Sequence, residues 1–283
     1  MTLPETAPAR GGARPDTTSL YFANLAYPAI AAAAASDPPT VLFFPVGSTE
    51  PHGPHSPLCT DPVISLGMCE RACLRLRDDP ELRGLILPLL PYGVTRYTAS
   101  FGGAIHVREE TLHALVVDVC RSLLDQGFRH VVLVNNHFEP EHVQTLHRAA
   151  DDVERERGAV VGYLDLTRKE RATRLTEEFR RGECHAGRYE TSLVLADRPE
   201  LVDRGTMVSL AYVPVNLAQV IAQGMKEFTE MGLESAYCGS PAEATAEEGE
   251  ESFAVLTEML VELARELVRG TGGRDRSGLF GRV

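Results

Sequence analysis

Short apolar runs alternate with amphipathic segments along most of the chain, and this alternation limits the fold more than any other feature. Four apolar runs begin at residues 40, 84, 130 and 159 and read TVLFFPVG, GLILPLLPYG, HVVLVNN and AVVGYLDL. Segments with apolar residues at helical spacing separate them, at 61–79, 108–128 and 139–158. Short buried strands between amphipathic helices are typical of parallel βαβ units. We therefore predict one α/β domain over residues 18–270, with a mostly parallel sheet and helices on both faces.

The two ends of the chain lack this pattern. Residues 1–17 are rich in Pro, Gly, Ala and Thr and contain no apolar run of the kind found in signal peptides. Residues 271–283 carry several glycines and follow a predicted helix. We expect a disordered N-terminal tail at 1–17 and a flexible C-terminal tail at 271–283. The segment LYFANLAYPAIAAAAA, residues 20–35, is predicted as an opening helix.

Composition excludes several classes of protein. The net charge of −12 and the pI of about 5.3 argue against a nucleic-acid partner, which would require a basic face. No segment approaches the roughly 18 apolar residues of a membrane helix. The six cysteines are scattered without a CxxC pair, so we expect reduced thiols in a cytoplasmic protein.

Metal-competent side chains gather in VGSTEPHGPHSPLCTD, residues 46–61, directly after the first predicted strand. The stretch contains Glu50, His52, His55 and Asp61 among five glycines and prolines that break regular structure. Glu50 and His52 are two positions apart, so both side chains point the same way in an extended segment. The stretch therefore presents candidate ligands from a loop at the end of a strand.

A second pair, His137 and Glu139, follows the third predicted strand in NNHFEPEH. The carboxyl ends of parallel strands meet at one edge of a sheet, so this pair and the first stretch should lie close together. Two histidines and three carboxylates can hold two divalent ions when one carboxylate bridges them. Mixed imidazole and carboxylate ligands suit Zn, Mn or related metals. The expected ligands are Glu50, His52, Asp61, His137 and Glu139.

A third cluster, CHAGRYETS, contains His185 and Glu190 just before an apolar helix. A carboxylate at a helix start, beside the hydroxyls of Thr191 and Ser192, can orient a water or a metal-bound ligand.

More than one role remains open for each residue taken singly. Glu50 or His52 alone could equally cap a helix or belong to a loop. A lone histidine is usually a surface or satisfied core residue. We assign such roles to His106, His113, His130, His142 and His147. The coincidence of two His–carboxylate clusters, both on loops after apolar strands, favours a metal site.

The same blocks resemble the creatininase (creatinine amidohydrolase) family. FPVGSTEPHGPHSPLCTD is similar to its Gly-Ser-x-Glu-Gln-His-Gly-x-His-x-Pro-x-x-Thr-Asp signature. YGVTRYTASFGGAIHV, GFRHVVLVNNHFEPEH, HAGRYETSLVLADRPELV and GSPAEATAEEGEESF resemble four further blocks of the family, in the same order. Departures include Pro51 for Gln and Asn136 for Gly. The creatinine enzyme closes its pocket with a Trp that this chain lacks.

The resemblance implies a three-layer α/β/α sandwich, a dinuclear centre and an amidohydrolase. Carried over by position, the five residues above are the metal ligands, with Asp61 as the bridge. His185 matches the family's catalytic and substrate-binding histidine, and Glu190 its conserved acid. The cofactors would be two divalent ions per subunit, Zn and/or Mn, with Fe also compatible. Many members form hexamers, so a homo-oligomer is implied.

The expected function is hydrolysis of an amide, lactam or formamide C–N bond of a small molecule by a metal-activated water. Phe138, His185 and Arg188 are expected to contact the substrate, and Arg96, Tyr97 and Arg181 are further candidates. Three competing hypotheses are a family peptidase that trims a modified precursor peptide, a catalytically silent metal-binding scaffold, and a nucleophile mechanism that uses Cys59 or Cys184.

Overall fold

Four parallel strands form the central sheet of the protein, whose computed structural model describes residues 17–275. They are β1 (Thr40–Val46), β2 (Arg83–Ile86), β3 (His130–Asn135) and β4 (Val161–Tyr163), in the order β2-β1-β3-β4. All seven residues of β1 are buried, as expected for a parallel strand that is covered on both faces. The predicted parallel sheet is confirmed.

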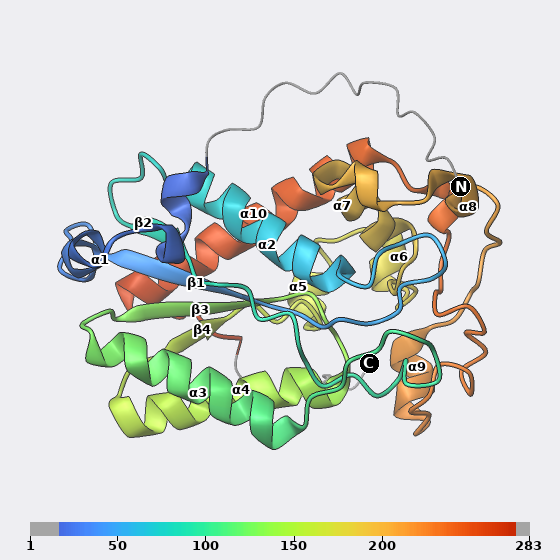
Figure 1. The fold of residues 1–283 in the computed structure, drawn as a ribbon, viewed down its shortest axis with the longest axis horizontal. Helices are drawn as coiled ribbons and strands as arrows, with labels where there is room; N and C mark the ends of the chain where they lie inside the picture. Colours follow the sequence, from blue (N-terminus) through green and yellow to red (C-terminus); the bar gives the residue numbers. More distant parts are fainter. Residues whose placement is uncertain (1–16, 276–283) are drawn as a thin grey trace.

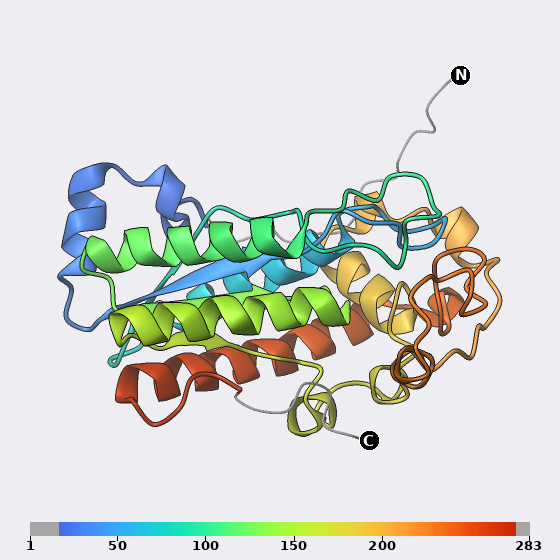
Figure 2. The ribbon, with the colours of Figure 1, turned by 90° about the horizontal axis from the view of Figure 1, so that it is seen from below.

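Helices cover both faces of this sheet (Figures 1 and 2). One layer contains α2 (Thr60–Arg75), α7 (Arg188–Asp197) and α10 (Ala246–Arg269), and the other contains α3 (Glu109–Asp125) and α4 (Pro140–Arg157). Each layer packs a separate apolar core on the sheet. Phe43 belongs to the core on the α2 and α10 side, and its neighbour Leu42 to the core on the α3 and α4 side, because successive strand residues point to opposite faces. The three-layer α/β/α sandwich is confirmed.

The opening helix is shorter than predicted. Residues 20–35 contain the end of one 3-10 turn, a second turn at Phe22–Asn24, and a helix, α1, only at Tyr27–Ala34. Pro28 lies in the first turn of α1. Proline has no N–H to donate and is tolerated only where a helix begins, so the helix starts immediately before it.

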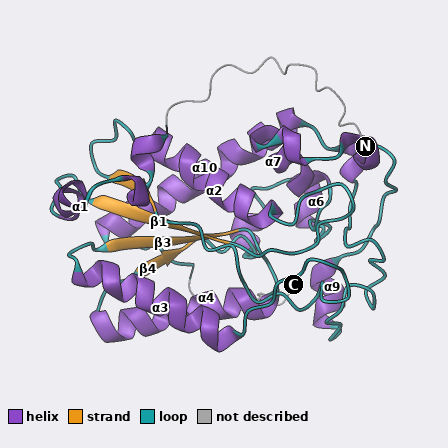
Figure 3. Cartoon of the chain, viewed as in Figure 1, coloured by secondary structure: helices purple, strands orange, loops and turns teal. Residues whose placement is uncertain are grey.

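The chain beyond the strand ends consists mostly of loops and short helices (Figure 3). The short elements there are α5 (Lys169–Ala172), α6 (Glu177–Arg180), η3 (Pro199–Leu201), α8 (Arg204–Met207), α9 (Leu217–Ala222) and η4 (Pro241–Glu243). Another short element, η1 (Thr18–Leu20), precedes the sheet and contacts β2. A third apolar cluster joins Tyr97 to Phe228, Met231 and Leu233 in this region. Within residues 17–275, no helix has both the length and the apolar character needed to cross a membrane.

The last described residues run along β4. The N–H of Tyr163 donates to the carbonyl of Gly273, and the N–H of Asp275 donates to the carbonyl of Tyr163. Residues 271–275 of the expected C-terminal tail therefore contact the edge of the sheet. Residues 276–283, and residues 1–16 of the expected N-terminal tail, lie outside the described part. The expected domain limits stay a prediction.

Asp165, directly after β4, should make stability depend on pH. Burial raises the pKa of this carboxyl, but hydrogen bonds from His147 and Thr167 outweigh burial and lower it. A carboxylate with a lowered pKa in the folded state stabilises the fold above its unfolded pKa, roughly 3.9, and this contribution is lost as pH falls through the folded pKa. We expect Asp165→Asn to lower the free energy of unfolding by about 1.5–3 kcal/mol at pH 7. In urea unfolding, the difference in free energy of unfolding between the wild type and Asp165→Asn should shrink below pH 4. A difference that stays constant with pH would contradict a lowered pKa of Asp165.

Candidate metal centre

The two predicted clusters meet at the carboxyl edge of the sheet. β1 and β3 are parallel neighbours, and their register pairs Val46 with Asn135. The loop that carries Glu50 and His52 leaves β1 at this point, and the loop that carries His137 leaves β3 beside it. The structure therefore brings together side chains that are about 85 positions apart, as predicted from the strand pattern.

Two buried groups of three side chains share one carboxylate. The first group consists of Glu50, Asp61 and His137, and the second of His52, Asp61 and Glu190. In the first, Nδ1 of His137 lies 2.9 Å from Glu50 Oε1 and 3.2 Å from Asp61 Oδ2. In the second, Nε2 of His52 lies 3.0 Å from Asp61 Oδ1 and 3.5 Å from Glu190 Oε2. Asp61 thus presents one oxygen to each group.

Backbone carbonyls fix which ring nitrogen faces each group. Nδ1 of His52 donates to the carbonyl of Glu50 across 3.0 Å, and Nε2 of His137 donates to the carbonyl of Val94 across 2.7 Å. A carbonyl can only accept, so each of these nitrogens carries a proton. The other nitrogen of each ring is the one that points into its group. Such a bond on the far side of an imidazole is the usual way in which proteins orient a metal-binding histidine.

The donor set fits divalent cations. His52 Nε2 and Asp61 Oδ2 are buried and meet only charged atoms of the groups themselves, such as Asp61 Oδ1 and His137 Nδ1, whereas Glu139 Oε1 is buried with no hydrogen-bond partner among the described residues. Burying a polar atom without a partner costs about 1–3 kcal/mol, which a bound cation would offset. Four buried carboxylates, those of Glu50, Asp61, Glu139 and Glu190, balance the charge of two divalent ions.

Without an ion, protons take the place of the metal. Burial lowers the pKa of His52, but the carboxylates of Asp61 and Glu190 raise it, and the result is a pKa of about 10. The pKa of His137 is likewise raised by Glu50 and Asp61 despite burial. Ion binding must therefore release protons from these imidazoles.

A family model described as creatinine amidohydrolase matches residues 23–264, which span most of the chain. The chain belongs to the creatininase family. A mycofactocin precursor peptide peptidase of Mycobacterium tuberculosis is 31% identical over 223 residues, which cover 77% of this chain and 81% of that protein. Creatinine amidohydrolase of Pseudomonas putida is 30% identical over 183 residues, which cover 59% and 68%.

The fold agrees with this membership. A solved structure named "Creatininase Mn" superposes with a TM-score of 0.71 at 24% identity, over 87% of this chain and 98% of that one. The creatininase family is a family of hydrolases, so the resemblance predicted from the sequence blocks is confirmed at the level of family, fold and hydrolase class.

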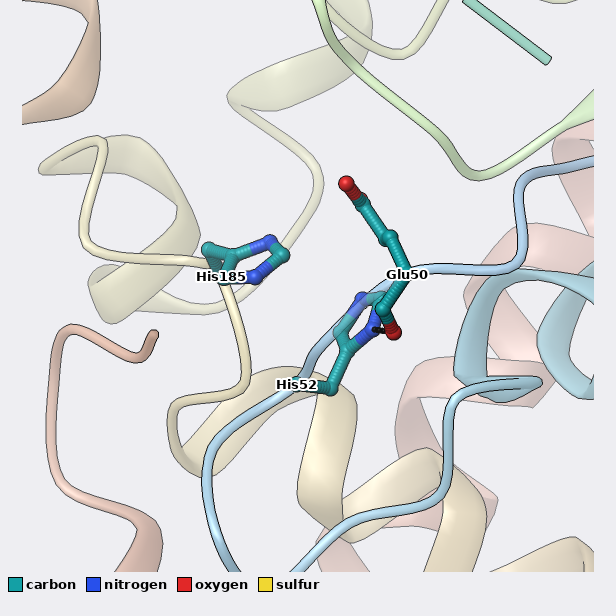
Figure 4. A group of neighbouring side chains, drawn as sticks. All are labelled: Glu50, His52 and His185. Atoms are coloured by element: carbon teal, nitrogen blue, oxygen red, sulfur yellow. Dashed lines mark hydrogen bonds between the residues drawn. The ribbon is translucent and has the colours of Figure 1, made fainter. Parts of the chain in front are cut away.

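His185 lies against the second of the two groups, beside His52. Its ring stacks on His52 with centroids 4.3 Å apart, and Glu50 lies beside both rings (Figure 4). Its Nε2 donates to the carbonyl of Pro51 across 3.0 Å, and Phe228 packs edge-on against it at 4.7 Å. Burial and the nearby charge of His52 lower the pKa of His185 to about 4. The imidazole is therefore neutral near pH 7.

Glu139 lies outside both groups, and Glu190 lies in the second. Oε2 of Glu139 accepts the backbone N–H groups of Arg96 and Tyr97 at 2.7 and 3.2 Å. Burial raises the pKa of Glu139 to about 7. Glu190, in the first turn of α7, accepts the N–H of Ala186 at 2.7 Å through the same oxygen that faces His52.

The structure brings none of the expected substrate-binding arginines into the two groups. Arg188 bonds to Glu248 and Glu243 of the α10 region, and Arg96 and Arg181 pair with Glu109 and Glu177. Phe138 packs edge-on against Phe179 at 5.6 Å. The substrate-binding roles of Phe138 and Arg188 stay predictions.

Three further contributors to the two groups were not predicted from the sequence. Thr98 donates to Glu50 Oε2 across 3.0 Å, and the Val94 carbonyl holds His137. His142, interpreted from the sequence as a surface or satisfied core residue, is fully buried and accepts the N–H of Val94. A backbone carbonyl leaves no residue-type signal, and no local pattern distinguishes Thr98. His142 alone offered a signal, because it lies in the first turn of the helix that follows His137.

Proposed function

We propose that this protein is a metal-dependent amidohydrolase that cleaves a C–N amide bond at a dinuclear centre. The observation that carries the proposal is the pair of buried groups that share Asp61, with one of its oxygens in each. The first group would hold one divalent ion and the second group the other, with Asp61 as the bridge. Imidazole and carboxylate donors suit Zn and Mn.

Glu190 is the ligand of the second ion in this proposal, a role expected of Glu139. Glu190 Oε2 faces His52, whereas Glu139 is held at one oxygen by two backbone amides and is not part of either group. Glu139 is then the proton carrier. Its free oxygen takes a proton from the attacking water and passes it to the leaving nitrogen.

Two divalent ions, when bound, would lower the pKa of a water molecule and polarise the substrate carbonyl. The chain's own residues do the rest. His185 is held by the Pro51 carbonyl and by stacking on His52, so its neutral ring is fixed beside the reacting bond and can hydrogen-bond the substrate. The burial of the whole cluster excludes competing water from these groups.

The proposed substrate is a small amide, lactam or formamide. Each residue of the two groups is at most 3% exposed, which suits a ligand that can be enclosed. The second candidate is a peptidase acting on the end of a modified peptide. It is favoured by one observation, the broader match to a peptide peptidase, 77% of the chain against 59% for the creatinine enzyme.

A silent scaffold and a cysteine nucleophile both have weaker support. A silent scaffold would not require two buried groups of imidazole and carboxylate donors that share one carboxylate. Burial raises the pKa of both Cys59 and Cys184, which leaves neither thiol activated as a nucleophile. A cytoplasmic homo-oligomer stays a prediction.

Product analysis by mass spectrometry separates the two substrate classes. The protein, loaded with Zn or Mn, is incubated with a panel of creatinine-like lactams, formamides and linear amides, and in parallel with peptides carrying free or modified C-termini. We expect turnover of at least one small amide and none of the peptides. Cleavage of peptides alone would replace the small-molecule proposal with the peptidase. Asp61→Asn serves as the control for contaminating hydrolases.

A further inference from the structure

Two buried histidines hold the backbone of Val94, one at its N–H and the other at its carbonyl. Its N–H donates to Nδ1 of His142 across 3.2 Å, and its carbonyl accepts from Nε2 of His137 across 2.7 Å. The two rings also meet edge to face, with centroids 4.7 Å apart. His142 is therefore coupled to His137 both directly and through the backbone of one residue, Val94.

The hydrogen bonds assign the proton of His142. A backbone N–H can only donate, so Nδ1 of His142 is bare and its proton is on Nε2. Nε2 then donates to Oδ1 of Asn135 across 3.1 Å. Asn135 in turn accepts the N–H of His137 at 3.2 Å and donates to its carbonyl at 2.7 Å. Each donor in this network meets an acceptor, and both ends of the network act on His137.

Close packing fixes the orientation of the His142 ring. It is fully buried, and a Cβ added at Gly93 would lie only 2.6 Å from its Nδ1 and Cε1 atoms. Real Cβ atoms do not approach so closely, so the backbone at Gly93 and the ring fit only because Gly93 has no side chain. The position of His142 is set by packing as well as by hydrogen bonds.

We propose that His142 is a positioning residue for the first metal group, acting through the Val94 backbone and Asn135. It holds the Val94 carbonyl where that oxygen takes the Nε2 proton of His137, so that Nδ1 of His137 faces the carboxylates of the group. The hydrogen bonds of His142 go to Val94 and Asn135, so its effect on an ion must pass through His137. The inference rests on the proposed dinuclear centre.

A competition titration with Zn chelators tests the effect on the metal. His142→Leu removes both hydrogen bonds and should lower the affinity for one of the two ions by about 10- to 100-fold. This is the range found when the hydrogen-bond partner of a metal ligand is removed. The other ion should keep its affinity. His142→Asn, whose side-chain oxygen can accept from Val94, should recover most of the loss. His147→Leu, on the same helix but bonded to Asp165, is the matched control and should bind both ions normally.

Hydrogen exchange of the metal-free protein tests the positioning itself. The Val94 amide and the Nε2–H of His137 should exchange slowly in the wild type and His147→Leu, and faster in His142→Leu. A folded His142→Leu protein with unchanged exchange, or with both ions weakened equally, overturns the inference. If His142→Leu does not fold, His142→Gln, which can reach Asn135 but lacks the acceptor for Val94, must show the faster exchange.

Results that overturn the proposed metal centre differ from results that overturn the role of His142. A wild-type protein that binds no ion overturns the proposed function, while faster exchange at Val94 in the variant would still support the positioning of His137. Normal ion binding in every variant, with unchanged exchange, overturns the inference and leaves the proposed function intact.

Discussion

Asp61→Asn should abolish both metal binding and turnover. Asp61 is the one residue common to both groups, with Oδ1 at 3.0 Å from His52 and Oδ2 at 3.2 Å from His137. An asparagine has one carbonyl oxygen and no charge, so it cannot ligate two ions at once. Loss of the ions removes several kcal/mol of transition-state stabilisation, and about 4 kcal/mol corresponds to roughly 10³-fold in rate. The measurements are bound metal by elemental mass spectrometry and kcat on the substrate identified by the panel.

Asp165→Asn is the matched control for this change. Asp165 is also buried and hydrogen-bonded to a histidine, but it lies after β4 and outside both groups. We expect this variant to lose stability and to keep its metal and its kcat at 25 °C. An Asp61→Asn protein with full metal content would show that Asp61 does not bridge two ions.

The second large effect is that substitutions of two glutamates, Glu139 and Glu190, should change metal content and kcat differently. Glu139→Gln should keep both ions and lower kcat by about 10²–10⁴-fold, the usual contribution of a positioned proton carrier. Glu190→Gln should lose one equivalent of metal and also lose activity. The difference arises because Glu190 faces His52 within the second group, whereas Glu139 is fixed by two backbone amides beside the groups.

The same pair of variants decides between two ligand sets. If Glu139→Gln loses an equivalent of metal and Glu190→Gln keeps both, then the ligands expected from the sequence are right and the assignment made from the geometry is wrong. His113→Gln, which changes a half-exposed residue bonded to Asp152 on the outer helices, should alter neither metal content nor kcat.

Most of the fold could be predicted because its signals are local. Leu42 and Phe43 alternate between two cores, and a run of such residues identifies a strand buried on both faces without knowledge of its partners. The position of the site followed from one further rule, that parallel strands end at the same edge, which joined Glu50 to His137. Pro28 shows the limit of the local signal, since an alanine-rich run predicted a longer helix than the proline permits.

The membership of the two groups was less predictable because the deciding contacts are not local. Glu190 reaches the second group only because α7 packs against α2, some 130 residues earlier in the chain, and sequence spacing carries no information on that approach. Glu139 and His137 are two positions apart, which suggested a joint role, and the structure shows Glu139 bonded to the amides of Arg96 and Tyr97 and outside both groups. The Val94 carbonyl has no side-chain signature at all.

The number of metal ions per protomer tests the dinuclear centre most directly. The protein should be purified without a His-tag or chelator, reconstituted with Zn or Mn, freed of excess metal and measured by elemental mass spectrometry against amino-acid analysis. The two groups that share Asp61 predict about two equivalents in the wild type and a near-complete loss in Asp61→Asn. A wild-type protein that stays free of metal after reconstitution would contradict the dinuclear centre, and with it the proposed hydrolysis.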